Sequence, residues 1–245
     1  MSRGVLSVVI PAYNEALRLP ATLARLHAHL GGREHEILVV DDGSADATAE
    51  VARAASGAVR VLRHEPNRGK GYAVRRGMLA ASGARRLLTD ADLSTPIEDL
   101  ALLEAALDAG SDVAIGSRAV AGARVEVHQG VHREAMGRLF NRLVQALLLP
   151  GLHDTQCGFK LFTAEAAEAA FGASTLDGFS FDVEALYVAR RRGLRIAEVG
   201  VTWRNDAATR VRLLGGAAAF ADVLRLRVRA WGGAYGARGG GGGAT

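Results

Sequence analysis

The stretch RRLLTDADLSTPIEDL, residues 85–100, contains the pattern from which the fold can be worked out. A short apolar run, RLLT, is followed at once by Asp90 and Asp92, with a single alanine between them. The run has the length and the composition of a buried strand. Two acids that repel each other therefore stand where a predicted strand ends.

A helix start follows the two acids. Thr95 is placed to cap the helix, Pro96 suits its first turn, and Glu98 completes a capping box. The stretch thus predicts a strand, a short acidic loop and a helix, in that order. Ligands of open α/β sheets bind in the crevice beyond the carboxyl ends of the strands, so the loop is a candidate site.

The same alternation extends along the first half of the chain. Strands are predicted for VLSVVI (5–10), EILVV (36–40), VRVLR (59–63), RLLT (86–89) and DVAI (112–115). Helices are predicted for ALRLPATLARLHAHL (16–30), ADATAEVARAAS (45–56) and YAVRRGMLAAS (72–82). Alternating strands and helices indicate an α/β fold, with a single Rossmann-like, mostly parallel sheet flanked by helices.

The alternation stops after Gly116. The segment SRAVAGARVEVHQGVH (117–132) is predicted to be a long basic loop, and a pair of strands is predicted around RIAEVGVTWR (195–204). Helices are predicted over 133–149 and 176–193, and the arginine-rich stretch 210–231 is amphipathic. We expect one domain over residues 1–231, followed by a disordered Gly-rich tail over 232–245.

Composition narrows the classes of partner. A net charge of +4 favours anionic ligands, and an aromatic content of 5% without basic–aromatic alternation argues against a nucleic-acid-reading surface. The single cysteine, Cys157, rules out an internal disulfide and favours a reducing, cytoplasmic setting. Since no run approaches the ~18 apolar residues of a transmembrane helix, none is expected.

The paired acids have two interpretations. Mg²⁺ or Mn²⁺ would relieve their repulsion by taking oxygen ligands from the protein and from substrate phosphates. The alternative is a solvated loop in which one aspartate caps the helix, because a lone D-x-D is a weak motif. The other predicted strand ends favour the metal: they carry PAYNE (11–15), DDGS (41–44) and NRGKG (67–71).

These motifs also carry a family resemblance. The segments VVIPAYNE, ILVVDDGSADAT, NRGKGYAVRRG, TDADLSTP and GSR occur in the order found in family 2 glycosyltransferases with the GT-A fold. The later segments REAMGRLFN, DTQCGFKLF and GFSFDVE resemble the branch that makes polyprenyl-phosphate sugars. The sequence is most similar to dolichyl-phosphate β-glucosyltransferases and next to dolichyl-phosphate mannosyltransferases, over roughly residues 5–210.

The resemblance implies a division of labour within the domain. Residues from 1 to about 117 would bind a nucleotide-sugar donor, and those from about 118 to 231, with C-terminal helices, would bind the acceptor. The donor-binding residues implied are Pro11, Tyr13, Glu15, Asp41, Asp42, Lys70, Asp90 and Ala91. Asp90 and Asp92 would hold Mg²⁺ or Mn²⁺ on the donor diphosphate. Asp92 would serve catalysis through this metal ion. Some relatives place a third metal ligand at the position of Ser94, and the identity of the third ligand stays open in this sequence.

On the acceptor side, the resemblance places Arg118 and Arg133 near an acceptor phosphate. Asp182, in GFSFDVE, lies where relatives that glycosylate hydroxyls carry a general base; with a phosphate acceptor it would instead orient an arginine or the sugar. For Lys160 and Arg204, a solvated surface charge is the simpler interpretation. Cys157 is interpreted as a small buried apolar residue.

The implied function is inverting, metal-dependent transfer of a hexose, with glucose from UDP-glucose preferred, to a polyprenyl phosphate. Two alternatives stay open: GDP-mannose-dependent mannosyl transfer to the same lipid, and transfer to a soluble or polysaccharide hydroxyl. A lipid acceptor requires contact with a bilayer. We therefore expect a cytoplasmic protein with peripheral contact at the inner face of the cell membrane, mediated by 210–231.

Overall fold

The computed structural model describes residues 4–55, 59–127, 131–204 and 214–235. Seven strands form one sheet in the order β3-β2-β1-β4-β7-β5-β8, in which β7 runs antiparallel to both neighbours and the other pairs are parallel. The strands are β1 (Leu6–Ala12), β2 (His35–Asp41), β3 (Val59–Arg63), β4 (Arg85–Leu88), β5 (Val113–Ser117), β7 (Lys160–Thr163) and β8 (Ile196–Gly200). The predicted mostly parallel α/β sheet is confirmed.

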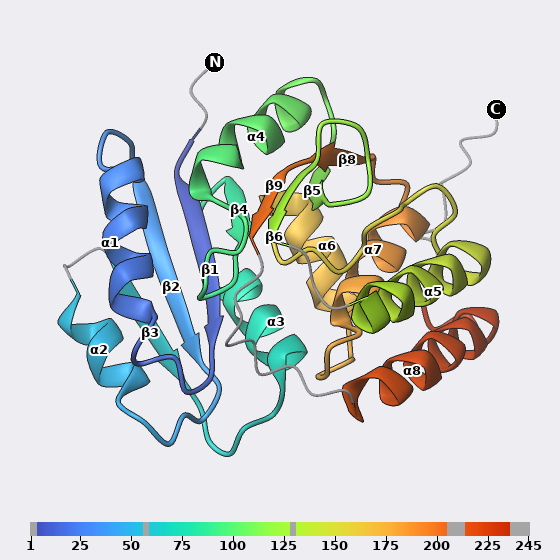
Figure 1. The fold of residues 1–245 in the computed structure, drawn as a ribbon, viewed down its shortest axis with the longest axis horizontal. Coiled ribbons are helices and arrows are strands. Elements are labelled where there is room, and N and C mark those ends of the chain that lie inside the picture. The colour runs from blue at the N-terminus through green and yellow to red at the C-terminus, as the bar shows by residue number, and fades with distance from the viewer. Residues whose placement is uncertain (1–3, 56–58, 128–130, 205–213, 236–245) are drawn as a thin grey trace, which may run out of the picture.

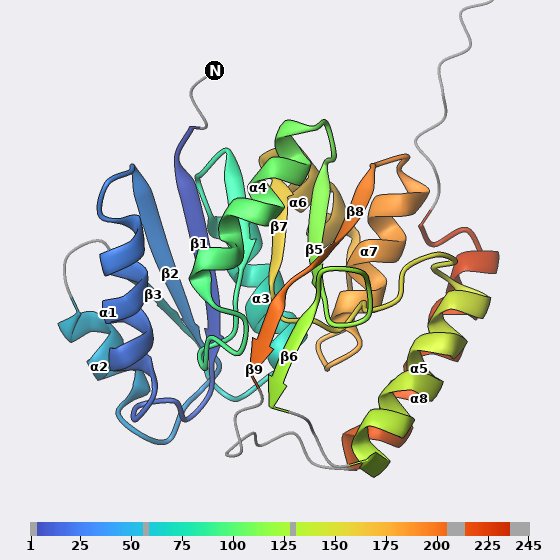
Figure 2. The ribbon, with the colours of Figure 1, turned by 45° about the horizontal axis from the view of Figure 1, so that its top comes forward.

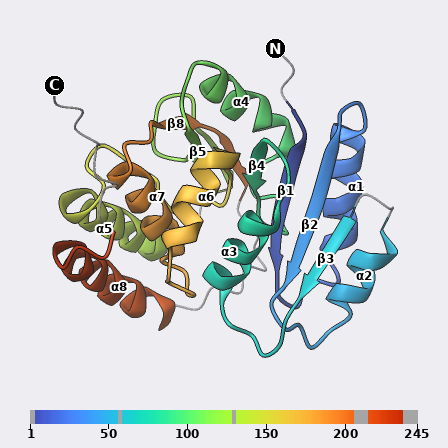
Figure 3. The same cartoon turned by 180° about the vertical axis from the view of Figure 1, so that it is seen from behind.

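Helices cover both faces of this sheet (Figures 1 and 3). They are α1 (Leu19–Leu30), α2 (Thr48–Ala54), α3 (Lys70–Ala80), α4 (Leu100–Asp108), α5 (Val131–Leu147), α6 (Ala164–Ala173), α7 (Phe181–Arg191) and α8 (Leu214–Trp231). One apolar core joins one sheet face to α1, α2 and α4, and the other joins the opposite face to α3, α6 and α7, with α5 and α8 beyond them. Figure 2 shows α4 in front of the sheet and α3 and α6 behind it.

The strand sequences are apolar on both sides because both faces are buried. In β1 every residue is buried; Val8 faces the core with α1, whereas Val9 faces the core with α3. Such uninterrupted apolar runs are typical of parallel strands between two layers of helices. At the far end of the molecule α5 and α8 lie side by side, with the rings of Phe140 and Phe220 5.4 Å apart.

Part of the predicted long loop after Gly116 is a strand. Residues Arg124–Val127 form β6, which pairs in parallel with β9 (Thr202–Arg204) in a separate two-stranded sheet. Both strands predicted around 195–204 exist, but they do not pair with each other: β8 lies beside β5 in the main sheet, and β9 pairs with β6. The pairing partners lie far apart in sequence, so no local pattern could reveal them.

Two helix starts also differ from expectation. The predicted capping box does not form: the chain after Pro96 makes a short 3₁₀ turn over Ile97–Asp99, and α4 begins at Leu100. Thr95 is buried against Cys157, and Glu98 pairs instead with Arg25 on α1. The predicted helix 176–193 begins only at Phe181, because the loop before it packs on the start of α3.

The Gly-rich tail is ordered further than its composition predicts. Residues 232–235 continue from α8, and Tyr235 is buried and donates a hydrogen bond to the carboxylate of Glu184 at 2.5 Å. The expectation of a disordered tail is therefore wrong for 232–235, while 236–245 lie outside the described residues. One aromatic residue that reaches a buried acceptor is enough to fix a glycine-rich turn.

Within the described ranges, no helix combines the length and the apolar character that a membrane span requires.

Candidate active site

The topology collects the polar motifs at one edge of the main sheet. The carboxyl ends of β1 to β5 meet there because these strands are parallel. Since β7 is antiparallel, its amino end lies at the same edge, and it brings the segment that ends at Lys160 beside β4 and β5. Asn14 and Leu93, the non-glycine residues with a left-handed backbone in the described part of the chain, both lie on loops at this edge.

The loops after β1 and β2 are hydrogen-bonded to each other. Asn14 donates its backbone N–H to Ser44 Oγ at 2.9 Å, and its side-chain oxygen accepts from the N–H of Ala45 at 2.8 Å. The backbone N–H of Glu15 donates to Thr48 Oγ1 at 2.8 Å. Tyr13 is 44% exposed on this frame, so its ring is available to a ligand.

Asp41, at the end of β2, has unused hydrogen-bonding capacity. It is fully buried, and one carboxylate oxygen accepts from the N–H of Ser44 at 3.0 Å. The other oxygen, Oδ2, lies 3.5 Å from Arg63 Nε but accepts no hydrogen bond from the described residues. A buried acceptor without a donor is costly, so a ligand N–H or hydroxyl at this position would be stabilising.

Asp42 has a different role from its neighbour. Its carboxylate accepts hydrogen bonds from the backbone N–H groups of Arg68 and Gly69, at 2.7 and 2.9 Å, and lies 2.7 Å from the ring of His64. It therefore fixes the loop that leads into α3. Lys70, the first residue of α3, is presented to the cleft by that loop.

The paired acids lie next to this lysine. Lys70 Nζ donates to Asp90 Oδ1 at 2.6 Å. Burial lowers the pKa of Lys70, but the negative charges of Asp90 and Asp182 outweigh it and hold the pKa above its usual value. Burial, and after it the charge of Asp90, raise the pKa of Asp92. The repulsion inferred from the spacing is thus present in the structure.

The donor set fits a divalent metal ion. Asp90 and Asp92 supply carboxylate oxygens, and among the described residues no cluster of three or more His, Cys, Asp or Glu side chains stands ready as a complete cage. Mg²⁺ and Mn²⁺ are often held by one or two carboxylates, with substrate phosphates and water as the other ligands. The backbone N–H of Ser94 donates to Asp92 Oδ1 at 2.9 Å and orients that carboxylate.

Gly158 shapes the space around Asp90. A Cβ atom at this glycine would lie 2.0 Å from Asp90 Oδ2, so a residue with a side chain would displace the carboxylate. Asp90, Gly158 and Trp203 line a small polar pocket, whose other lining residues are Thr89, Ser94 and Thr95. The pocket therefore lies directly against one of the two acids.

Arg118 follows β5 and extends toward the same acids. Asp154 accepts from Arg118 Nε and Nη2 at 2.7 and 2.8 Å, and the ring of Trp203 lies 5.2 Å from the guanidinium carbon. Burial lowers the pKa of Arg118, but the hydrogen bond and charge of Asp154, and the charge of Asp90, hold it above its usual range. A permanent cation therefore stands within electrostatic reach of Asp90.

Asp182 and Lys160 form a second, buried pair. Lys160 Nζ donates to Asp182 Oδ1 at 2.6 Å and also to the backbone oxygen of Cys157, and the lysine is 1% exposed. The interpretation of Lys160 as a solvated surface charge is therefore wrong. Burial raises the pKa of Asp182, and the Lys160 ammonium opposes that rise. Asp182 is thus occupied by an internal ion pair.

The structure places most of the remaining residues named in the sequence analysis. Pro11 is buried within β1, Ala91 is buried between the two acids, and Arg204 is half-exposed and pairs with Glu126. Cys157 is buried, and burial raises the pKa of its thiol, as expected of a small apolar residue. The side chain of Arg133 lies outside the described residues.

Asp154, Glu198 and Trp203 were not among the residues predicted for the site. Asp154 lies in DTQCGFKLF, but only the antiparallel entry of β7 brings that segment to the site edge. Trp203 is delivered by β9, whose Arg204 N–H donates to the oxygen of Ser94 at 2.8 Å. An alignment of relatives would be the signal for such residues, because their partners are distant in sequence.

The structure thus brings the paired acids after β4, the buried acceptor after β2 and several cations to one edge of a mostly parallel sheet, in agreement with the GT-A fold that the motifs led us to expect. Comparison with known proteins gives the family. The model of "Glycosyl transferase family 2" matches residues 7–171. The chain belongs to glycosyl transferase family 2, and it is therefore an enzyme that transfers a sugar.

Curated relatives extend the match over most of the chain. A dolichyl-phosphate β-glucosyltransferase of Dictyostelium discoideum is 35% identical over an alignment of 244 positions, which covers 91% of this chain and 74% of that protein. The dolichyl-phosphate β-glucosyltransferase of Homo sapiens is 38% identical over an alignment of 216 positions, which covers 81% of this chain and 67% of that protein. The resemblance to this branch, inferred from the motifs, is confirmed.

Solved structures bear out the fold. Glucosyl-3-phosphoglycerate synthase of Mycobacterium tuberculosis, in complex with Mn²⁺, UDP and glucosyl-3-phosphoglycerate, superposes with a TM-score of 0.72 at 22% identity, over 92% of this chain and 80% of that one. Mannosyl-3-phosphoglycerate synthase of Rubrobacter xylanophilus gives 0.73 at 22% identity, over 94% and 75%. At this identity the likeness establishes the GT-A fold.

Proposed function

We propose that this enzyme transfers glucose from UDP-glucose to a polyprenyl phosphate, with inversion at the anomeric carbon. The relatives that cover most of the chain are named for glucosyl transfer to dolichyl phosphate. The site geometry supports an acceptor that is itself an anion. The choice of UDP-glucose as donor rests on the names of the relatives and on the structural neighbours solved with UDP.

The observation that carries the proposal is the state of Asp182. A hydroxyl acceptor needs a general base to take its proton, and Asp182 is the acid that the family pattern offers for this. In this protein Asp182 is 5% exposed and hydrogen-bonded to Lys160. A phosphate oxygen is already ionised at neutral pH and needs no such base, so the pairing of Asp182 favours a phosphate acceptor.

The donor would bind across the strand ends. Asp41 Oδ2, buried without a hydrogen-bond donor among the described residues, would accept from the nucleoside, and Tyr13 would offer its exposed ring. Asp90 and Asp92 would hold Mg²⁺ or Mn²⁺ against the diphosphate. When bound, such an ion supplies a positive charge that stabilises a departing diphosphate.

The protein itself would bring two anions together. Lys70 donates a hydrogen bond to Asp90, and Arg118, which lies within electrostatic reach of the same carboxylate, would face the acceptor. Arg118 Nη1 makes no hydrogen bond within the part of the chain that the structure describes, so it is available to a phosphate oxygen. Fixed cations of this kind lower the cost of aligning the acceptor oxygen with the anomeric carbon.

The decisive experiment is a panel of labelled donors and acceptors. UDP-glucose and GDP-mannose are each incubated with polyprenyl phosphate, with 3-phosphoglycerate or with a soluble hydroxyl acceptor, in Mn²⁺ or EDTA. We expect a lipid-extractable glucosyl product that requires UDP-glucose, polyprenyl phosphate and the metal. Lipid product from GDP-mannose alone would replace the donor, and product with a hydroxyl acceptor alone would overturn the phosphate acceptor.

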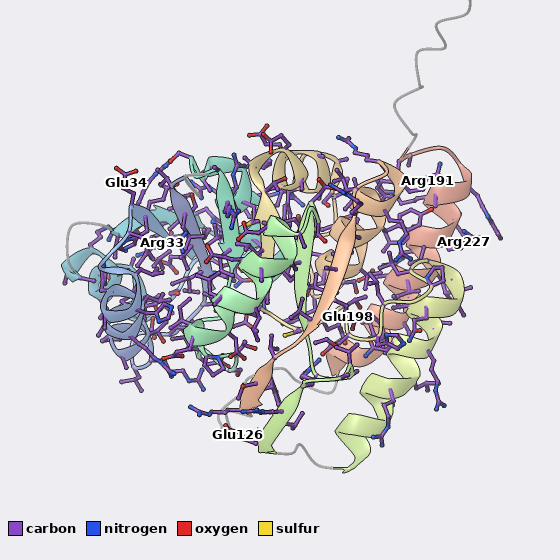
Figure 4. The ribbon with its side chains drawn as sticks, turned by 90° about the horizontal axis from the view of Figure 1, so that it is seen from above. Arg33, Glu34, Glu126, Arg191, Glu198 and Arg227 are labelled. Atoms are coloured by element: carbon purple, nitrogen blue, oxygen red, sulfur yellow. The ribbon has the colours of Figure 1, made fainter. Side chains whose placement is uncertain are left out.

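A lipid acceptor implies that the enzyme works at a bilayer surface, and α8 carries a suitable face. Leu224, Val228 and Trp231 follow one another at helical spacing and are 54, 64 and 73% exposed. Arg225 is exposed beside this stripe, and the guanidinium of Arg227 lies 4.9 Å from the Trp231 ring, at the rim of the molecule in Figure 4. Apolar residues flanked by arginines suit an anionic headgroup layer.

Flotation with liposomes tests this part of the proposal. The protein is expected to float with vesicles that contain anionic lipid, and the variant Leu224→Gln/Trp231→Gln is expected to lose most of that binding. Leu102→Gln is the matched control, because Leu102 is 46% exposed on α4. Equal flotation of the double variant and the control would contradict docking through α8.

A further inference from the structure

Arg118 is held by the carboxylate of Asp154, a residue that was not among the predicted site residues. Asp154 accepts three hydrogen bonds from this one residue: from Nε at 2.7 Å, from Nη2 at 2.8 Å and from the backbone N–H at 3.0 Å. The acid is 2% exposed, and the side chain of Arg118 is 29% exposed. This fork-to-fork geometry fixes the plane of a guanidinium as well as its position.

Asp154 is fixed in turn by β8. Glu198 accepts from the backbone N–H of Asp154 at 2.7 Å and from that of His153 at 2.8 Å. Glu198 lies on β8 opposite Ile115 of β5, the strand that ends at the residue before Arg118, and Figure 4 shows its place on the strand. The carboxylate that orients Arg118 is therefore anchored to the rigid part of the sheet.

The guanidinium of Arg118 also lies near the pocket that Asp90 lines, because Trp203 contacts both. Trp203 lies 5.2 Å from its central carbon and also lines the pocket against Asp90. With Nε and Nη2 bound to Asp154, Nη1 has no hydrogen-bond partner among the described residues. A free arginine side chain loses rotamer entropy when it binds a ligand, and the contacts with Asp154 remove that entropy before the ligand arrives.

We propose that Asp154 is a positioning residue for the transfer reaction: it holds Arg118 against Trp203 so that the free Nη1 meets the anionic oxygen of the acceptor next to Asp90. The proposal rests on the proposed function, because it names the acceptor phosphate as the group that Arg118 binds. Asp154 acts only through Arg118. Its loss should weaken the use of the acceptor and leave the binding of the donor nucleotide intact.

Steady-state kinetics of Asp154→Asn test this directly. The variant keeps the size of the side chain but loses the ion pair, and we expect the KM for polyprenyl phosphate to rise about 10- to 100-fold, as a lost hydrogen bond to a charged group would give. The Kd for UDP with Mn²⁺, measured by calorimetry, should change less than about twofold. Asp112→Asn, the same change at the opposite end of β5, is the matched control and should alter neither value.

A double-mutant cycle separates positioning from a general structural role. In an Arg118→Ala background, Asp154→Asn should have no further effect on the acceptor KM, since its only route of action is gone. Additive losses would overturn the proposal. Added guanidinium ion should restore part of the activity of Arg118→Ala but not of Arg118→Ala/Asp154→Asn, and equal restoration in both would also overturn it.

Failure of the inference and failure of the proposed function give different results. If the wild-type enzyme glycosylates no polyprenyl phosphate, the proposed function is wrong, and the kinetics of Asp154→Asn are then read on whichever acceptor it does use. If the wild type is active and Asp154→Asn behaves like Asp112→Asn, only the inference is wrong. If Asp154→Asn fails to fold, Glu198→Gln is tested in its place, because it weakens the hydrogen bonds that hold the backbone of Asp154. This variant must raise the KM for the acceptor without changing the Kd for UDP, and the proposal is wrong if it does not.

Discussion

At the scale of single residues, Gly158 controls the position of Asp90. The absent side chain leaves the space that the Asp90 carboxylate fills, and Lys70 holds that carboxylate from the other side at 2.6 Å. A metal-binding acid is useful only when it is held in place, because a shift of about 1 Å at a reacting centre can cost about a hundredfold in rate. The glycine thus serves the site although it has no chemical group to contribute.

Gly158→Ala is expected to lower the transfer rate on the order of a hundredfold while the protein stays folded. The added Cβ would overlap Asp90 Oδ2, so the carboxylate must move. The rate is measured as lipid-extractable product per folded enzyme. Gly172→Ala on α6 is the control, since a Cβ there meets no atom within 4 Å. A Gly158→Ala variant as active as this control would show that Asp90 is not placed as described.

Glu36 is one of the residues whose charge links stability to pH. It accepts from Ser7 Oγ and from the backbone N–H of Ser82, both at 2.6 Å, where β2, β1 and the turn before β4 meet. Burial raises its pKa, but the hydrogen bonds from Ser7 and Ser82 outweigh burial and hold the pKa below its ordinary value of 4.5. The ionised form is therefore favoured by folding.

The depressed pKa sets the sign of the pH dependence. The contribution of Glu36 is fully present above the pKa of an unfolded glutamate, 4.5, and is lost as pH falls through the lower folded value. At pH 7, Glu36→Gln should reduce the free energy of unfolding by about 1 to 2 kcal/mol. The difference from wild type should shrink below pH 4.5. Urea denaturation at several pH values measures it, and a difference that grows toward acid pH would contradict the assignment.

At the scale of elements, a buried ion pair joins β7 to α7. Lys160 opens β7 and Asp182 lies in the first turn of α7, and both are almost completely buried. The pair lies within electrostatic reach of Lys70 as well, so the charges on three elements are balanced against one another. Removing one partner of such a pair leaves an uncompensated charge in the interior.

Asp182→Asn is therefore expected to cost about 3 to 5 kcal/mol in the free energy of unfolding, measured by urea denaturation. The double variant Lys160→Met/Asp182→Leu should recover most of that loss, because an apolar pair of similar size carries no buried charge. If the double variant is folded and still transfers glucose to the lipid, Asp182 is no general base. A folded but inactive double variant would favour a hydroxyl acceptor.

At the scale of the whole molecule, residues before and after Arg118 contribute to the same candidate site. The strands β7 and β8 come from beyond residue 118, yet they lie in the same sheet as β1 to β5. The proposed nucleotide side and the proposed acceptor side would therefore share one sheet, and they would meet near Asp90. On the far side of the molecule, Tyr235 and Glu184 attach the end of α8 to α7.

Binding of the donor nucleotide should stabilise the whole chain. At a free concentration 100 times the Kd, UDP with Mn²⁺ is expected to add about 2.7 kcal/mol, which raises the Tm by about 5 to 10 °C for a chain of this size. Asp92→Asn should lose the part of the shift that depends on Mn²⁺, whereas Asp222→Asn on α8 should keep it. An Mn²⁺-dependent shift that survives in Asp92→Asn would place the metal elsewhere.

The sequence by itself determined the alternation of strands and helices, the two acids after the fourth strand and the family. These follow from local properties: apolar periodicity, glycine-containing turns and motifs whose residues lie within a few positions of one another. Asp90, Asp92, Asp41 and Lys70 were predicted in this way. The local signals failed at Thr95, where burial against Cys157 prevailed over the capping pattern.

Only the tertiary structure decided which distant residues meet. The insertion of β7 between β4 and β5 brought Asp154 to Arg118 and buried Lys160 against Asp182, and the pairing of β9 with β6 placed Trp203 beside Asp90. Such contacts join positions about 20 to 100 residues apart, and their energy depends on burial that no short segment has alone. A charged residue has the same identity whether it is solvated or buried, so its role is decided by the fold.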